Sequence, residues 1–190
     1  MTPLPPTACL LLIDLQQAID DPSWAAAGPR NNPGAEAHVA SLLDGWRLTG
    51  RPVIHVRHNS VNPDSTYRPG QPGHDFKPEA RPEPGEKIIG KETNSAFIGT
   101  GLEDYLRQCG IEMLIVAGVI TNNSVEATVR MAGNLSFDTW LIGDACFTFA
   151  RHDLSGRLWR AEEVHALSLA NLDGEYCTVT DTAAMLSRLG

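Results

Sequence analysis

Short apolar runs alternate along this chain with segments of helical periodicity, and this alternation restricts the possible folds more than any other feature. Residues 8–13 and 112–117 are too short for helices and have the largely continuous apolar character of strands buried on both faces. Residues 34–49 instead space their large apolar side chains as the stripe of an amphipathic helix. Strands that alternate with helices form parallel βαβ units. We therefore expect an α/β fold, with a doubly wound parallel sheet of about six strands flanked by helices.

The same patterns predict where each element lies. Strands are expected at residues 8–13, 52–56, 86–89, 112–117, 138–142 and 175–179. Helices are expected at 34–49, from a capping box of Thr100 and Glu103 onward, at 122–134, at 161–171 and after Asp181. Residues 59–85 are rich in Pro and Gly and have no periodic segment. Because loops of this length usually have a function in a compact protein, we expect this one to lie over the site.

Length and charge limit the classes of function. The chain of 190 residues fits one domain, 1–190. Asp and Glu outnumber Lys and Arg by 23 to 15, which gives a net charge of −8 and no basic surface for nucleic-acid phosphates. No positive segment precedes the apolar run that ends at Asp14, and no run reaches the roughly 18 apolar residues of a membrane span. We expect a protein that binds neither nucleic acid nor membranes.

The cysteines indicate a reducing compartment. The chain has four, far apart and with no CxxC pair, so they match neither a zinc knuckle nor a disulfide-rich secreted scaffold. They are Cys9, Cys109, Cys146 and Cys177. We expect buried free thiols and a cytoplasmic protein.

Three polar residues follow apolar strands, where open parallel sheets bind their ligands. Asp14 follows the first strand, Lys91 lies just past the third, and Ser124 lies in the first turn of the helix after the fourth. There Ser124 faces exposed amide groups and the positive end of the helix dipole, which favour a developing anion. Each residue also has an ordinary interpretation: a turn carboxylate, a solvated lysine, and a serine that starts a helix.

Three segments, taken together, resemble the isochorismatase-like cysteine hydrolase family. They are residues 11–16, Lys91 with residues 94–102, and residues 118–130, and the resemblance extends over about residues 8–179. It implies a Rossmann-like sheet of six parallel strands and a homodimer or homotetramer. It also implies a small-molecule substrate, since the family includes nicotinamidases, N-carbamoyl amidohydrolases and isochorismatases.

The resemblance also implies roles for individual residues. Asp14 and Lys91 match the family's catalytic aspartate and lysine, and Ser124 stands at the position of its cysteine. Cys146 is a weaker substitute on position. A cis peptide is implied between Val119 and Ile120, with the backbone amides of Ile120 and Ser124 as an oxyanion hole.

The serine leaves the chemistry open. A thiol near pKa 8.5 becomes a thiolate beside a cation and a helix N-terminus, whereas a hydroxyl needs a positioned base. Asp14 alone is a poor base, and a carboxylate beside Lys91 keeps that lysine protonated. Three explanations fit: a substitution that traps substrate, a natural serine variant with altered chemistry, or a branch without a covalent nucleophile. Isochorismatases proper have no covalent nucleophile, and their aspartate protonates a vinyl ether.

We expect neither a metal nor another cofactor. Nicotinamidases in this family bind a divalent ion through an Asp-x-His pair and a later His, but the segment here is His55-Val56-Arg57-His58, with His74 in the loop, and the aspartate is missing. The expected substrate-binding residues are Gln16, Arg57, His58 and Phe97, with Trp24 and Phe76 as further candidates. His165, on a predicted helix, is interpreted as a packing residue.

The sequence thus predicts a hydrolase that acts on a C–N bond of a small amide or ureido compound. Asp14 shuttles the proton, Lys91 orients Asp14 and stabilises negative charge, and Ser124 occupies the nucleophile position. The second interpretation is vinyl-ether hydrolysis without a covalent intermediate. The third, from another functional class, is a catalytically impaired relative that binds a small molecule without turnover.

Overall fold

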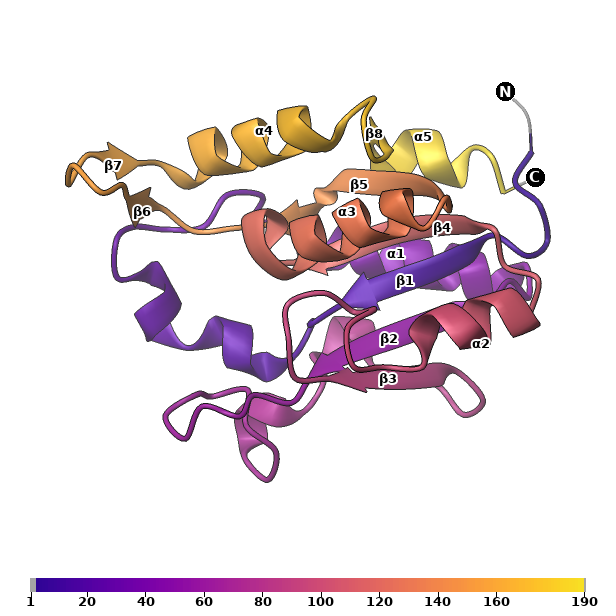
Figure 1. The fold of residues 1–190 in the computed structure, drawn as a ribbon, viewed down its shortest axis with the longest axis horizontal. Helices are drawn as coiled ribbons and strands as arrows, with labels where there is room; N and C mark the ends of the chain where they lie inside the picture. The colour runs from indigo at the N-terminus through magenta and orange to yellow at the C-terminus, as the bar shows by residue number, and fades with distance from the viewer. Residues whose placement is uncertain (1–2, 190) are drawn as a thin grey trace.

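Six parallel strands form the centre of the molecule, in the order β3-β2-β1-β4-β5-β8 (Figure 1). This computed structural model describes residues 3–189. The strands are β1 Cys9–Ile13, β2 Val53–His58, β3 Lys87–Lys91, β4 Met113–Val119, β5 Asp138–Phe147 and β8 Thr178–Thr180. The predicted doubly wound α/β fold is therefore confirmed.

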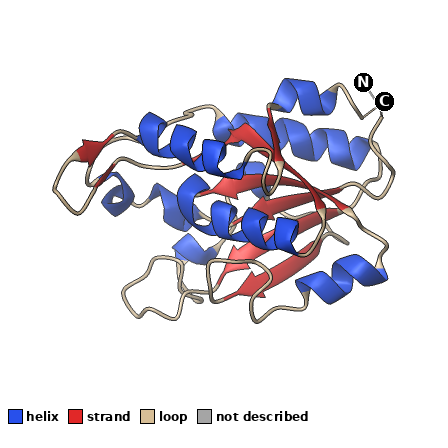
Figure 2. Cartoon of the chain, turned by 45° about the horizontal axis from the view of Figure 1, so that its top comes forward, coloured by secondary structure: helices blue, strands red, loops and turns tan. Residues whose placement is uncertain are grey.

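Helices cover both faces of the sheet (Figure 2). The first apolar cluster joins one face of the sheet to α1 Ala35–Leu48 and α5 Thr182–Leu186, and the second joins the other face to α2 Leu102–Gln108, α3 Glu126–Asn134 and α4 Ala161–Leu172. The predicted stripe of α1 is buried, and the indole of Trp46 donates to the carbonyl of Ala8 at 3.0 Å. Burial of each large apolar side chain stabilises the fold by about 1.5–3 kcal/mol. No helix within residues 3–189 is long and apolar enough to cross a membrane.

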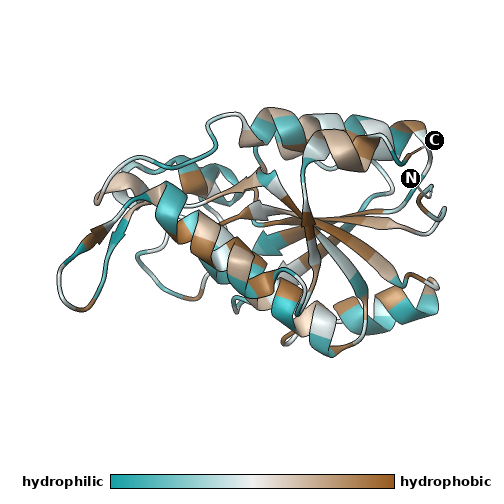
Figure 3. Ribbon diagram, turned by 90° about the horizontal axis from the view of Figure 1, so that it is seen from above, coloured by the Kyte–Doolittle hydropathy of each residue, from teal (hydrophilic) through white to brown (hydrophobic). Residues whose placement is uncertain are grey.

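Strand β1 is buried along its whole length because both of its faces pack against helical layers. Leu10 and Leu12 belong to the cluster on the α1 side, and Cys9, Leu11 and Ile13 to the opposite one. Figure 3 shows the apolar strands between the two layers. A continuous apolar run is the expected sequence of such a strand.

The order of the strands places a crevice at the end of β1. The chain passes from β1 through β2 to β3 at one edge, and then returns to β4 on the other side of β1. The segments that follow β1 and β4 therefore diverge, and such a switch point is where doubly wound sheets bind ligands. Asp14 follows β1, and the turn Thr121–Val125 follows β4.

All six strands differ from their predicted bounds by at least one residue, and Lys91, expected just past the third strand, is the last residue of β3. Two strands differ by three residues or more at one end. Strand β5 continues five residues beyond the predicted end at Ile142, because the interruption at Gly143 and Asp144 is accommodated by a shift in register against β4. Strand β8 begins at Thr178, three residues later than predicted. The backbone amides of Tyr176 and Cys177 instead donate to the carbonyl of Leu172 and close helix α4.

Other local predictions were wrong in whole or in part. The capping box is absent: Gly101 is the N-cap of α2, and the Thr100 hydroxyl donates to the carbonyl of Ala96 at 2.5 Å. The helix predicted at 122–134 is present and ends at Asn134 as expected, but its first turn, Thr121–Val125, is kinked at Asn122 before α3 begins. The sequence also contained no signal for the antiparallel hairpin of β6 Arg151–His152 and β7 Leu158–Trp159, which projects from the body (Figure 1).

The predicted loop at 59–85 contains two short 3-10 helices, Pro72–His74 and Pro78–Ala80. Its second half is anchored by the buried ammonium of Lys77, which lies 2.5 Å from the carboxylate of Asp20 and 3.2 Å from that of Glu36. Its first half reaches the crevice beside β1, as the following section describes.

Candidate active site

The three catalytic candidates converge at the carboxyl ends of β1, β3 and β4. The ammonium of Lys91 lies 2.7 Å from Oδ2 of Asp14 and 3.3 Å from Oγ of Ser124, and it donates to the carbonyl of Thr93 at 3.0 Å. All three side chains are buried, with residue exposures of 4% for Asp14, 2% for Lys91 and 7% for Ser124. The structure therefore brings together the residues that the sequence singled out.

Asp14 leaves β1 in a conformation that is uncommon for residues other than glycine. Its φ is +52°, its amide donates to the carbonyl of Val56 at 3.0 Å, and its carbonyl accepts from the hydroxyl of Tyr67 at 3.3 Å. Aspartate tolerates this left-handed region better than most residues. The turn directs the carboxylate across the strand ends toward Lys91.

The two oxygens of this carboxylate differ in their environment. Oδ2 accepts from Lys91, whereas Oδ1 is buried and has no hydrogen-bond partner among residues 3–189. Burial raises the pKa of Asp14, and the positive charge of Lys91 opposes that rise. A free, desolvated carboxylate oxygen is well suited to accept or deliver a proton.

Ser124 is placed by a backbone turn that needs glycine at its base. Gly118 has a φ of +130°, and a Cβ there would lie 2.2 Å from the carbonyl oxygen of Ile13, so a side chain would push β4 away from β1. The peptide between Val119 and Ile120 is cis, as the resemblance implies. The Ile120 amide has no hydrogen-bond partner among residues 3–189, so it is free to donate to an oxyanion.

The turn is fixed from outside by side chains of other elements. A ring nitrogen of His165 on α4, Nδ1, lies 2.8 Å from the hydroxyl of Thr121, and the Thr148 hydroxyl donates to Oδ1 of Asn122 at 2.5 Å. His165 is buried, in agreement with its interpretation as a packing residue, but it also holds the turn that carries Ser124.

A cavity of about 110 Å³ opens on the catalytic group. Its polar lining is Asp14, His58, Ser65, Asn94, Asn123 and Ser124. Its apolar and aromatic walls are Ile19, Trp24, Tyr67, Val119 and Ile120. Ser65 and Tyr67 belong to the long loop, so the prediction that this loop lies over the site holds for its first half.

Three of the four expected substrate-binding residues do not line this cavity, and only His58 does. Gln16 is fully buried, and its side chain bonds to the backbone of His58 and His74. Phe97 stacks on Phe137, with ring centroids 5.8 Å apart. The guanidinium of Arg57 lies 5.7 Å from the ring centroid of Phe76, and neither residue lines the cavity. Their contacts indicate that Gln16, Arg57 and Phe97 stabilise the protein structure around the cavity.

The histidines that resemble the remains of a metal site lie in separate environments. Nε2 of His55 is 2.8 Å from the carboxylate of Glu86, and Nε2 of His74 is 2.7 Å from the amide oxygen of Asn59. Burial lowers the pKa of His58. Within residues 3–189 no group of three or more His, Cys, Asp or Glu side chains is placed to hold a metal ion.

None of the four cysteines lines the cavity. Cys146 is completely buried in β5, and burial raises the pKa of its thiol to about 12, so it cannot replace the missing thiolate. Three of the cysteines are buried free thiols, as expected, but Cys109 is exposed. None of the four thiols is therefore placed to act with Asp14 and Lys91, whereas the hydroxyl of Ser124 lies 3.3 Å from the ammonium of Lys91.

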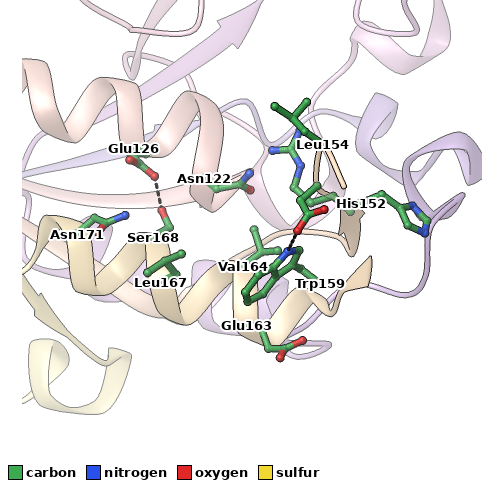
Figure 4. Close-up of a pocket in the computed structure, with 12 residues that line it drawn as sticks. Asn122, Glu126, His152, Leu154, Trp159, Glu163, Val164, Leu167, Ser168 and Asn171 are labelled. Atoms are coloured by element: carbon green, nitrogen blue, oxygen red, sulfur yellow. Dashed lines mark hydrogen bonds between the residues drawn. The ribbon is translucent and has the colours of Figure 1, made fainter. Parts of the chain in front are cut away.

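A larger cavity of about 400 Å³ lies between the β6–β7 hairpin, α3 and α4 (Figure 4). On its floor the hydroxyl of Ser168 donates to the carboxylate of Glu126 at 2.6 Å, and Trp159 and Leu167 line its walls. It shares no lining residue with the catalytic cavity. Choosing the candidate active site by cavity volume alone would therefore have missed Asp14, Lys91 and Ser124.

The sequence analysis missed four polar or aromatic residues of the catalytic cavity: Ser65, Tyr67, Asn94 and Asn123. The two asparagines lie within the segments that carry the family resemblance, so their position was a usable signal. Ser65 and Tyr67 lie in a loop without periodicity, and only the tertiary structure brings them to the site.

Comparisons with known proteins identify a matching family and a matching fold. The isochorismatase domain model matches residues 8–184. The isochorismatase family protein YrdC of Bacillus subtilis is 38% identical over 178 residues, which cover 94% of each chain. A solved structure of an isochorismatase-family protein from Chromobacterium violaceum is 62% identical, with a TM-score of 0.95, and the match covers 100% of this chain and 98% of that one. The ureidoacrylate amidohydrolase RutB of Methylobacterium radiotolerans is 33% identical over 109 residues, which cover 57% of this chain and 38% of RutB.

Proposed function

The chain belongs to the isochorismatase family of hydrolases, and from this premise we propose that it hydrolyses a C–N bond in a small amide or ureido compound. One observation carries the proposal: Lys91 makes buried contacts with Asp14 and Ser124, while Oδ1 of Asp14, beside a small cavity, has no hydrogen-bond partner in the described part of the chain. The name of the relative RutB, an amidohydrolase of ureidoacrylate, supports the same bond type.

In the proposed reaction, Oγ of Ser124 attacks the carbonyl carbon and its proton passes to Oδ1 of Asp14. The backbone amides of Ile120 and Ser124 stabilise the negative carbonyl oxygen of the tetrahedral intermediate. Asp14 then returns the proton to the nitrogen, the C–N bond breaks, and ammonia or an amine leaves. Water, deprotonated by Asp14, hydrolyses the ester on Ser124 and restores the site.

Lys91 has two roles in this scheme. It fixes the orientation of Asp14 through Oδ2, so that Oδ1 faces the proton to be moved. Its charge, 3.3 Å from Oγ of Ser124, also lowers the cost of negative charge on the nucleophile. Since hydroxyls are much weaker nucleophiles than thiolates, we expect slow turnover by the chain as it stands.

Ammonia release from a panel of small amides and ureas tests the proposal when this chain and its Ser124→Cys variant are assayed in parallel. We expect the variant to be faster by about tenfold or more, because a thiol beside Lys91 and a helix start becomes a thiolate. A Ser124→Ala variant is the matched control and should be inactive. Absence of ammonia release from both the parent and the Ser124→Cys form would exclude the amidohydrolase.

Vinyl-ether hydrolysis is the second candidate function, and the serine itself favours it, because that reaction needs no covalent nucleophile. It requires Asp14 as an acid, whereas amide hydrolysis requires Asp14 as a base. For amide hydrolysis Ser124→Ala should be inactive, whereas for vinyl-ether hydrolysis the Ser124→Ala variant should keep its activity and Asp14→Asn should lose it.

The pH profile separates the two candidates. Burial raises the pKa of Asp14 above its ordinary value, so the change of protonation state lies above about pH 4. If Asp14 is the base, kcat/KM for an amide rises with pH through that pKa, because only the ionised form accepts a proton. If Asp14 is the acid, kcat/KM falls over the same range. Profiles from pH 4 to 9 on an amide and on a vinyl ether decide between them.

A further inference from the structure

Among residues 3–189, no unpaired positive charge lines the catalytic cavity. The ammonium of Lys91 has three N–H groups, and three acceptors lie within hydrogen-bond distance: Asp14, the carbonyl of Thr93 and Ser124. Its charge is matched by the carboxylate of Asp14, with which it forms a buried ion pair. A second anion entering the cavity therefore finds no free counter-charge on Lys91.

The other cationic side chains near the site do not provide a counter-charge for an anionic ligand either. Arg57 does not line the cavity, and burial lowers the pKa of His58, which keeps its ring neutral. Arg151 lines two other cavities, of about 130 Å³ and about 400 Å³, and does not line the catalytic one. The smaller of these two lies next to the catalytic cavity and shares only Trp24 and Ile120 with it.

What the cavity does offer is neutral hydrogen-bonding groups. The side chains of Asn94 and Asn123 lie at its exposed rim and have no hydrogen bond to any of residues 3–189. Ser65 lines the same cavity, and its hydroxyl accepts from the amide of Tyr67 at 3.2 Å. Amide side chains both donate and accept, which matches the N–H and C=O groups of a carboxamide or urea. The volume of about 110 Å³ is well below the roughly 300–1,000 Å³ of sites for drug-sized ligands.

We infer that the site takes small uncharged carboxamides or ureas, with Asn94 and Asn123 as specificity residues, and rejects short compounds that carry a carboxylate. This inference rests on the proposed function. A carboxylate that enters the cavity loses its hydration, gains no cation and repels the charge of Asp14. An uncharged amide of the same shape avoids all three costs.

Isosteric pairs test the inference directly. Succinamide and succinamate differ only by replacement of an amide by a carboxylate, as do ureidoacetamide and ureidoacetate. With the parent chain and the Ser124→Cys form, we expect kcat/KM for the uncharged member to exceed that of its anionic partner by about a hundredfold or more. Succinamide should release a single equivalent of ammonia, because its product succinamate is the excluded anion. Calorimetric titration of both members into the parent chain provides a second readout.

Two variants check the cause of the selectivity. Asn94→Lys places a cation at the exposed rim and should raise kcat/KM for ureidoacetate by about tenfold relative to ureidoacetamide, whereas the matched Asn94→Ala should not. Arg151→Ala should leave the ratio unchanged, since Arg151 lies outside the cavity.

The outcomes separate this inference from the function on which it rests. Equal turnover of the two members of each pair, or a ratio that depends on Arg151, would overturn the inference and leave the amidohydrolase intact. Absence of turnover and of binding for every compound, with both forms of the chain, would overturn the proposed function and the inference with it.

Discussion

Replacement of Asp14 by Asn is expected to reduce ammonia release from the best amide substrate by about a thousandfold or more. The substitution keeps the shape of the side chain but removes its ability to accept the proton of the nucleophile at Oδ1. Steady-state kinetics of the parent and of the Ser124→Cys form, each with and without the substitution, measure the effect. The loss should appear in kcat rather than in KM, because the proton moves only in the transition state.

The fold should survive this replacement, which is what makes the kinetic result interpretable. The amide oxygen introduced by Asp14→Asn can still accept from Lys91, and burying a neutral amide costs less than burying a carboxylate. The substitution leaves the ammonium of Lys91 buried without a counter-ion, so urea unfolding should show a smaller free energy of unfolding than in the parent, whereas circular dichroism should show the same fold. Full activity in a folded Asp14→Asn protein would contradict the role of Asp14 in either candidate reaction.

Replacement of Lys91 by Met is expected to have the largest effect on stability. The side chain is buried, and its removal leaves the carboxylate of Asp14 buried without a counter-ion. Loss of one partner of a buried pair typically costs about 3–5 kcal/mol. Urea unfolding at neutral pH should therefore show a decrease of that order in the free energy of unfolding relative to the parent.

The pH dependence of that decrease identifies its cause. Without Lys91, the pKa of Asp14 in the folded state rises further above its unfolded value, because the positive charge that opposes the rise is gone. A raised pKa in the folded state means that stability is present below the unfolded pKa and is lost as pH rises through the folded pKa. The deficit of Lys91→Met should therefore shrink from pH 8 toward pH 4.

A double variant provides the control for this argument. Asp14→Asn combined with Lys91→Met removes both charges, so it should recover much of the lost stability and abolish the pH dependence of the deficit. A pH-independent deficit in Lys91→Met, or no recovery in the double variant, would show that lost packing rather than an orphaned carboxylate is responsible.

The proximity of Asp14, Lys91 and Ser124 could be predicted because each of them lies at or shortly after the carboxyl end of a predicted strand. Residues 8–13 and 112–117 have no polar positions on either face, apart from Glu112 at the start of the second run, so their identity as central strands was clear. Parallel strands bring their carboxyl ends to one edge of a sheet, and Asp14, Lys91 and Ser124 therefore had to lie near one another. The sequence alone did not contain the distances or the unpartnered oxygen of Asp14.

The errors came from features that depend on tertiary contacts. Strand β5 passes through Gly143 and Asp144, which end a strand by local preference, because a register shift against β4 accommodates them. The predicted capping box does not form because Gly101 is the N-cap of helix α2 and the Thr100 hydroxyl donates to the carbonyl of Ala96 in the preceding turn. Local propensity is a weak guide where such partners exist.

The binding residues were harder to predict than the catalytic ones for a geometric reason. Gln16 lies only two residues from Asp14, yet it points to the backbone of the neighbouring strand end and of the loop. Neighbours in sequence after a strand do not share a direction, because the chain turns sharply at Asp14. Tyr67 reaches the site from a loop whose path only the folded structure reveals.

We propose that the Asp14, Lys91 and Ser124 site breaks a C–N bond of an amide. The most direct test of this proposal is a ¹³C NMR time course with a mixture of a carbonyl-labelled small amide and a vinyl ether, incubated with the parent chain and with its Ser124→Cys form. We expect conversion of the amide carbonyl to a carboxylate, with ammonia in equal amount, faster in the Ser124→Cys sample and at background rate after Asp14→Asn. Consumption of the vinyl ether while the amide persists in both samples would contradict it.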